Sequence, residues 1–390
     1  MTYGVAIQIP EVPITETWSW ITDIGISYNG TEDRTALLRY PRRSFSGNFA
    51  FDDVTSMRRH LAMMTKRYRT EFQFPLWQYQ TKLKAAAGIG DDTVTVNARR
   101  GDFREGQTVI VIEGTKFETV VIDTFDATSL TFTTTLTKAY SARAVVCPAV
   151  TVFTATNASV SRRNPDGSGT SSFNYVERLP TLPFVSPLNE AVVATFDSLP
   201  VLPYVPIGQS FEATVATGLT SVEYTAIVDI VSPWTYEQWG YALSFKASAI
   251  GNVDDFEWWQ LFADTIQGSQ NPFLMATNRA DMQIVTPASP NGTGITVTGD
   301  EYSQHYYGHG GFSRIFIDTD AGRHYAKVTG IVSVGGNDRL VFTPALPAGT
   351  AWGTGQRVGF LLKLRVNDDK ITLDHSGLST VVGLNVRTVV

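Results

Sequence analysis

The chain has 390 residues, 43% of them hydrophobic, and a net charge of −6. This length favours two domains or slightly more, and the charge excludes an overall basic field that would draw the chain to nucleic acid or to an anionic membrane. The single cysteine, Cys147, excludes a disulfide framework and an all-cysteine metal site. We expect this thiol to be buried and inert at the end of a strand.

The N-terminal segment predicts strands and no targeting signal. Its first 13 residues lack a basic region and a long apolar run, so we expect no secretory signal and folding in a cytoplasm. No apolar run in the chain reaches the ~20 residues of a membrane helix, so we expect no membrane insertion. Residues 5–10 predict one strand, and residues 17–38 predict a long strand or two with a turn at Asn29-Gly30.

Four arginines follow that turn closely, and they are Arg34, Arg39, Arg42 and Arg43. The simpler interpretation is solvated charge on an edge strand, which blocks wrong strand pairing. The alternative is a contact with acidic groups of another subunit.

A strand–helix–strand unit comes next. Residues 44–51 alternate apolar with small or polar residues, which predicts a half-buried strand. Two aspartates can cap the helix predicted over 54–69, where apolar residues recur at helical spacing. Residues 70–79 predict a returning strand, in which Pro75 indicates an edge or a bulge.

A second stretch, residues 241–277, repeats this unit in the same order and at similar lengths. Further matches follow it along the chain, and the offset between matched residues grows from 199 to 210 in one direction, whereas chance matches would scatter. We interpret the pattern as an internal duplication. The matched segments are 93–96 with 295–298, 106–112 with 312–318, 117–125 with 324–332, 129–136 with 339–346, and 156–177 with 366–389.

The predicted fold class is mainly β, with one β-sandwich and one flanking helix in each copy. Dense polar turns between short strands predict that each copy also carries an inserted small β-barrel-like module. Repeated prolines predict a semi-rigid connector between the copies. The predicted domains are a first sandwich of 1–80 plus 149–178, an inserted module of 81–148, a connector of 179–204, a second sandwich of 205–279 plus 365–390, and a second inserted module of 280–364.

A search for chemistry yields few candidates, because the sequence contains no nucleotide-binding loop, metalloprotease motif or serine-hydrolase elbow. The histidines in the second module could bind a metal, but the glycines among them favour a polar surface loop. This group consists of His305, His309 and His324, with Asp300, Glu301 and Asp318 nearby.

Two other groups have both a functional and a structural interpretation. A carboxylate group near the C-terminus could do acid–base work, but a solvated turn is the simpler interpretation; its members are Asp368, Asp369, Asp374 and His375. The pair Trp258-Trp259 on the second helix could form a sugar platform, but a core position is simpler. We therefore expect no catalytic, cofactor-binding or metal-binding residues.

Several segments together resemble the tail-tip proteins of long non-contractile-tailed bacteriophages. These segments are FPLWQY (74–79), NPFLMAT (271–277), AGRHYAKVTGI (321–331), RLVFTPAL (339–346) and LRVNDDKITLDHSG (364–377). The resemblance covers nearly the whole chain, and its motifs are structural rather than catalytic. It implies a distal-tail or baseplate protein in the virion, assembled in the host cytoplasm, with β-sandwich domains like those of a tail tube.

The resemblance also implies partners. We expect a homo-oligomeric ring, either a trimer with pseudo-sixfold symmetry or a hexamer, that contacts the tail tube protein and the hub and fibre proteins of the tip. DNA would only pass through its lumen. The alternative function is a receptor- or carbohydrate-binding module. The candidate contact surface consists of Tyr302, His305, Tyr306, Tyr307, His309 and Trp352.

Overall fold

The computed structural model is mainly β, as the sequence predicts, with 52% of it in strands that pair mostly antiparallel. It describes residues 4–27, 32–67, 70–156, 160–162, 169–178, 180, 182–208, 213–216, 220–224, 227–231, 238–249, 253–320, 322–348, 357–377 and 379–389. The predicted turn at Asn29-Gly30 and the contact residue Trp352 lie outside these ranges.

The first half of the chain forms a sheet, called the first sheet below, with the strand order β2–β5–β14–β12–β6–β1. Helix α1 (Val54–Arg67) connects β5 to β6, and the short strand β13 (Val160–Arg162) pairs with β14. Only the pairing of β1 with β6 is parallel. The strand bounds are β1 Gly4–Val5, β2 Pro10–Ser19, β5 Arg42–Phe51, β6 Phe72–Pro75, β12 Val145–Thr154 and β14 Gly169–Glu177.

The second half forms a sheet, called the second sheet, with the order β17–β20–β28–β27–β21–β16. Helix α2 (Val253–Ile266) connects β20 to β21, and the pairing of β16 with β21 is again parallel. Strand β16 begins at Leu199, within the predicted connector. The bounds are β16 Leu199–Leu202, β17 Ala213–Ala216, β20 Gln238–Ala249, β21 Phe273–Ala276, β27 Val358–His375 and β28 Ser379–Thr388.

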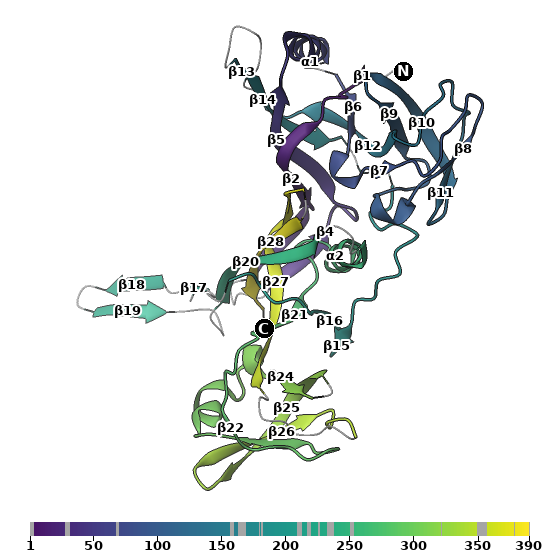
Figure 1. Cartoon of the computed structure of the whole chain (residues 1–390). Helices are drawn as coiled ribbons and strands as arrows, with labels where there is room; N and C mark the ends of the chain where they lie inside the picture. The colour runs from purple at the N-terminus through teal and green to yellow at the C-terminus, as the bar shows by residue number, and fades with distance from the viewer. Residues whose placement is uncertain are drawn as a thin grey trace.

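Each sheet carries an inserted module, and the two modules have matching ladders. The first runs β8–β11–β10–β9 onto β12, and the second runs β23–β26–β25–β24 onto β27. Figure 1 shows the second module at the end of the molecule opposite α1. The bounds are β7 Thr81–Lys82, β8 Thr93–Thr95, β9 Thr108–Glu113, β10 Lys116–Phe125, β11 Ser129–Phe132, β22 Ile284–Thr286, β23 Gly294–Val297, β24 Arg314–Thr319, β25 Gly322–Val334 and β26 Asn337–Thr343.

Two hairpins and several short elements complete the fold. Hairpin β3–β4 follows β2, and hairpin β18–β19 follows β17. Their bounds are β3 Thr22–Ile26, β4 Glu32–Ala36, β18 Thr220–Tyr224 and β19 Ile227–Val231, and the other elements are β15 Thr195–Phe196, η1 Trp77–Tyr79, η2 Ala98–Arg100, η3 Tyr302–Tyr306 and η4 Gly310–Phe312.

The prediction of one strand over 70–79 is partly wrong. Strand β6 ends at Pro75, and the 3₁₀ turn η1 follows, with Trp77 and Tyr79 buried. Strand β6 lies between β1 and β12, so Pro75 marks neither an edge nor a bulge but the end of a central strand. All four residues of β6, including the polar Gln73, are buried, so burial is continuous where the sequence predicts alternation.

Among the described strands, one antiparallel pairing joins the two sheets. Residues Ile14–Ser19 of β2 pair with Lys370–His375 at the end of β27. Trp18 of β2 is 1% exposed and packs in the core of the second half. Its ring lies 4.6 Å from that of Phe184 in the connector, edge to face. The connector is therefore packed onto the junction.

Asp369 fastens this junction from the side. It lies in a bulge of β27 at φ 54°, and its carboxylate accepts hydrogen bonds from the backbone N–H and the hydroxyl of Thr22, at 2.8 and 2.9 Å. It also accepts hydrogen bonds from the N–H of Ser269, at 2.6 Å, and from the Ser269 hydroxyl. Gly268 leaves room for this contact, since a Cβ there would lie 2.7 Å from the carboxylate.

We predict that Asp369→Ala lowers the free energy of unfolding by ~2–4 kcal/mol, because four donors lose their charged acceptor and alanine is strained at positive φ. The measurement is denaturant unfolding followed by tryptophan fluorescence. Asp368→Ala is the matched control, since the exposed Asp368 binds only the Asn385 amide, at 3.0 Å, among the described contacts. Equal losses in the two variants would contradict this role.

Candidate functional site

Buried charges gather where β2, β5, the first module and α2 meet. Arg43 of β5 donates to Asp102 at 2.6 Å and to Glu177 at 3.4 Å, and its guanidinium lies 4.0 Å from Glu16. Arg104 donates to Asp102 from the other side. These five residues, called the ionic cluster below, are all less than a tenth exposed.

Asp102 links parts of the chain that lie far apart in the sequence. It belongs to the first module, and it accepts a hydrogen bond at 3.0 Å from Nε2 of Gln260 on α2. Because Arg43 belongs to the first sheet, this carboxylate connects the first sheet, the first module and the helix of the second half. Arg104 also binds the connector to the ionic cluster, because it donates a hydrogen bond to the carbonyl of Pro183.

Glu16 is the second carboxylate of the ionic cluster that crosses the junction. It accepts hydrogen bonds from Trp18 Nε1 at 2.8 Å and from the Tyr79 hydroxyl at 2.7 Å. Gln78 Nε2 donates to it at 3.1 Å, and Nε2 of His375, on β27, lies 3.3 Å away. Every oxygen of this fully buried carboxylate therefore has a partner, as burial of a charge requires.

The electrostatics hold the carboxylates in their charged form. Burial alone raises the pKa of Glu16, but the hydrogen bond to His375 and the charge of Arg43 outweigh burial, so the pKa lies below its ordinary value. Burial likewise raises the pKa of Asp102, and the two neighbouring guanidiniums, Arg104 and Arg43, bring it below its ordinary value. The carboxylates in turn raise the pKa of Arg43 despite burial. The ionic cluster is thus a set of mutual ion pairs.

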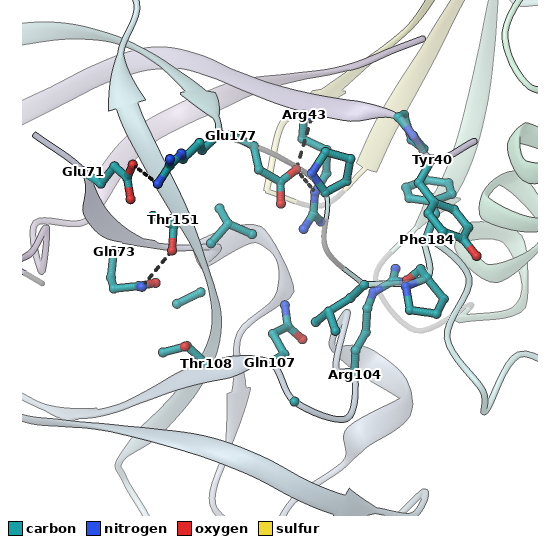
Figure 2. Close-up of a pocket in the computed structure, with 18 residues that line it drawn as sticks. Tyr40, Arg43, Glu71, Gln73, Arg104, Gln107, Thr108, Thr151, Glu177 and Phe184 are labelled. Carbon is teal, nitrogen blue, oxygen red and sulfur yellow. Dashed lines mark hydrogen bonds and ion pairs between the residues drawn. The ribbon is translucent and has the colours of Figure 1, made fainter. Parts of the chain in front are cut away.

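A cavity of about 300 Å³ lies beside the ionic cluster, between the first sheet, the first module and the connector. Figure 2 shows Arg104 and Gln107 on one side of it and Gln73 and Thr151 on another. Gln73 Nε2 donates to the Thr151 hydroxyl at 2.9 Å. This volume is at the lower limit of ligand pockets. Among the described residues, the buried Oε1 atoms of Gln73 and Gln107 in its lining have no hydrogen-bond partner.

A second group of charges fastens hairpin β3–β4 to the second sheet. Glu32 lies 2.8 Å from Arg34 and 2.9 Å from Arg365, and it also accepts from Arg387. Arg34 donates to the carbonyl of Ser269 at 3.0 Å. Burial and the Arg34 charge lower the pKa of Arg365 to about 10.

The interpretation of the arginines as solvated edge charge is wrong for two of the four. Arg43 lies in the ionic cluster, and Arg34 has a 3% exposed side chain in the Glu32 group. Both form ion pairs with acidic residues of the same chain. The reason is that β2 and hairpin β3–β4 are covered by the second half of the same chain.

The predicted contact surface in the second module is only partly exposed. Tyr302 is 3% exposed and donates to the carbonyl of Phe312 at 2.8 Å, so it belongs to the core. Tyr306 packs against Phe312 and is partly buried, and His309 is also partly buried. The predicted loop is a π-helical turn at residues 302–306, which turns these rings inward.

His305 and Tyr307 remain exposed, and Tyr307 is 51% exposed. Among the described residues, no group of three or more histidine, cysteine, aspartate or glutamate side chains could hold a metal ion.

The predictions for the remaining residues have mixed outcomes. Trp258 and Trp259 are 7% and 0% exposed, which confirms the core position. Cys147 is buried, as predicted, and burial raises the pKa of its thiol. The solvated-turn interpretation is wrong for Asp369 and His375, because Asp369 binds Thr22 and Ser269 and His375 contacts Glu16.

Four members of the ionic cluster are not among the candidates that the sequence offers, and they are Glu16, Asp102, Arg104 and Glu177. A signal for Glu16 is present, because it stands between Ile14 and Trp18 in an alternating strand, and an acid on an apolar face needs a buried partner. Asp102 and Arg104 belong to a polar loop and give no such local signal.

We predict that Arg43→Met lowers the free energy of unfolding by ~3–5 kcal/mol, because it leaves buried carboxylates without their cation. Arg43→Lys keeps the charge but not the several donors, so its loss is smaller. Arg59→Met on the exposed face of α1 is the control. A loss below about 1 kcal/mol for Arg43→Met would mean that the ionic cluster does not hold the parts together.

The lowered pKa values of Glu16 and Asp102 predict loss of stability in acid. Their ordinary values are 4.5 and 3.8, so the contribution is complete above about pH 5 and falls as pH drops through the lower folded-state values. Asp102→Asn should therefore flatten the fall of unfolding free energy between about pH 5 and pH 3. Glu105→Gln, at an exposed neighbour, should leave that slope unchanged.

The sequence matches no model of a known protein family and no curated protein. Among the described residues, no helix is both long and apolar enough to span a bilayer. The site itself is a set of buried ion pairs that join the two halves, the first module and the connector. Such an arrangement fixes relative positions, which is the property that any function proposed for the chain must use.

Proposed function

We propose that this chain is a structural protein of the tail tip of a long non-contractile-tailed bacteriophage. It would form a ring that connects the tail tube to the baseplate or to the central tip and its fibres, without catalysis. The observation that carries the proposal is the junction of β2 with β27, where one sheet of the chain continues sideways into the other.

The two sheets support a duplicated fold. Both have six strands in a matching order, a parallel pairing at one end and a helix between matching strands. The inserted modules match in register as well, since Val94 lies opposite Leu130 and Ile295 lies opposite Leu340. Leu130 and Leu340 occupy positions that the repeat in the sequence assigns to one another, whereas Val94 matches Ile295, one residue away from the match of 93–96 with 295–298.

Two similar units joined side by side can form a ring. The junction is heterologous, because β2 of one unit contacts the end of β27 of the other. Repetition of a heterologous step closes into a ring when its rotation divides a full turn. Three chains would then give six similar units, which suits a protein between a sixfold tube and a threefold tip. A ring of six chains is the alternative stoichiometry.

The buried ion pairs also suit a structural protein whose two units must keep a fixed relative orientation. An ion pair with its partners removed from water keeps one geometry, because any shift leaves a buried charge unpaired. Arg43 and Asp102 would thus hold the two units at one angle. The net charge of −6 would let DNA slide through a lumen without adhering.

The alternative function, a receptor- or carbohydrate-binding module, has less support. Such a module needs several exposed aromatic rings, whereas Tyr302 and Tyr306 pack inside the second module. Tyr307 and His305 would contact the fibres or the hub in a tail-tip protein.

We predict that the purified chain is a trimer in light scattering and appears in negative-stain images as a ring of six lobes around a hole. A ring of six chains would still agree with the tail-tip function. In that ring, one unit of each chain would form the ring and the other would project outward from it. A monomer at high concentration that also binds a glycan array would contradict the proposal and favour the receptor-binding alternative.

A further inference from the structure

The junction inside the chain has two parts that act together. Strand β2 pairs along its outer edge with β27, and hairpin β3–β4 lies against the second sheet just beyond. Thr22 of the hairpin binds Asp369, and Glu32 binds Arg365 at 2.9 Å. One half of the chain thus offers a strand and a hairpin, and the other half receives them.

The second half contains the same two offering elements. Strand β17 pairs with β20 as β2 pairs with β5, and hairpin β18–β19 follows β17 as β3–β4 follows β2. Among the described strands, β17 pairs with β20 alone, and β18 pairs with β19 alone. Figure 1 shows this hairpin projecting from the side of the molecule. An open strand edge of this kind is a template for another chain.

The first half contains the matching receiving surface. Strand β13 stands where the end of β27 stands in the second sheet, since both continue the sheet beside the last strand, β14 or β28. Among the described strands, β13 pairs with β14 alone. Val160 on β13 is 41% exposed, and Phe153 on β12 is 39% exposed. The strands that would receive the partner therefore carry two partly exposed apolar side chains.

The chemistry of the two junctions differs in a complementary way. Phe153 in the first sheet occupies the position that Arg365 has in the second. In the first sheet, Phe153 follows Val152, which pairs with Phe72 at the start of β6. In the second sheet, Arg365 follows Leu364, which pairs with Phe273 at the start of β21. At the junction inside the chain, Glu32 of hairpin β3–β4 forms an ion pair with Arg365 at that position. The sequence of the second hairpin, with Ile-Val-Asp-Ile-Val at 227–231, is mostly apolar. It therefore suits the apolar receiving surface of the first half.

We infer that β17 and hairpin β18–β19 dock on β13 and β12 of a second copy of this chain, in the way that β2 and hairpin β3–β4 dock on β27. The inference rests on the proposed ring and names its contact. Since the step repeats the one inside the chain, the open edges of β17 and β13 are both paired once the ring closes.

The in-chain junction also fixes the register. Glu16 lies opposite Leu373. Ala213 takes the place of Glu16, and Val160 takes the place of Leu373, so Ala213 should lie opposite Val160 of the neighbour. These equivalences follow from residues that pair side by side across neighbouring strands. The row Glu16–Phe45–Tyr175 of the first sheet matches the row Ala213–Tyr241–Val386 of the second. The row Val160–Ser171–Phe49 of the first sheet matches the row Leu373–Val382–Phe245 of the second.

The test is disulfide formation between cysteines placed at this contact. The full chain with Ala213→Cys and Val160→Cys is oxidised and separated on a non-reducing gel. We expect loss of the monomer band to a covalent trimer, because directly opposed strand residues lie within disulfide reach. A mixture of the two single-cysteine variants should give dimers only. The native Cys147 is buried and stays in every variant.

Two further variants serve as controls. Thr15→Cys with Asp374→Cys places the pair at the junction inside the chain, and it should cross-link within one chain whether or not a ring forms. Val215→Cys with Val160→Cys is two residues out of register, and it should cross-link poorly. Equal cross-linking of the in-register and out-of-register pairs would overturn the assigned register.

A deletion separates this contact from the proposed function. Replacement of residues 217–232 by a short glycine–serine loop should leave the melting curve of the chain intact and abolish the ring. A ring that persists after the deletion, or forms without the Ala213–Val160 cross-link, would overturn this contact and leave the ring function standing. A monomeric wild-type chain with no cross-link would overturn both.

Discussion

The structure depends on one antiparallel pairing, between β2 and the end of β27. Main-chain hydrogen bonds alone would let the two halves twist about this seam. The ionic cluster removes that freedom, because Asp102 binds Arg43 of the first sheet and Gln260 of the second helix. Asp369 and the Glu32 group fasten hairpin β3–β4 on the far side of the seam. The two halves of the chain are therefore joined by main-chain pairing, by buried ion pairs and by the hairpin β3–β4.

Burial of charged groups at this junction costs solvation free energy, which the surrounding cations and hydrogen-bond donors offset. Each carboxylate loses water on burial, and the loss is recovered only when cations and donors surround it with good geometry. Glu16 and Asp102 meet that requirement, since both keep a pKa below the ordinary value despite burial. A seam of this kind resists small shifts more steeply than an apolar one, because apolar contacts tolerate sliding and unpaired buried charges do not. This property suits a part that transmits force between a tube and a tip.

Much of the fold follows from local patterns, whereas the site does not. The helix at 54–67 was predictable from apolar spacing and its aspartate cap, and Asp53 does accept a hydrogen bond from the Ser56 N–H at 2.8 Å. The short strands of the two modules follow from the polar turns between them, and the two modules have matching strand ladders. The ionic cluster was not predictable, since Glu16 and His375 stand 359 residues apart and no local rule pairs them. Tyr302 was placed on the surface because glycines nearby suggested a loop, but a helical turn directs its ring into the core.

The central claim is that two units of one chain, and three chains in turn, meet through the same strand junction. A three-dimensional reconstruction of the assembled particle by electron cryomicroscopy tests it most directly. The account predicts six sheets in a closed ring, with three junctions of β2 with β27 inside chains alternating with three junctions of β17 with β13 between them. A ring whose chains meet through the inserted modules, with β17 still exposed at its edge, would contradict it.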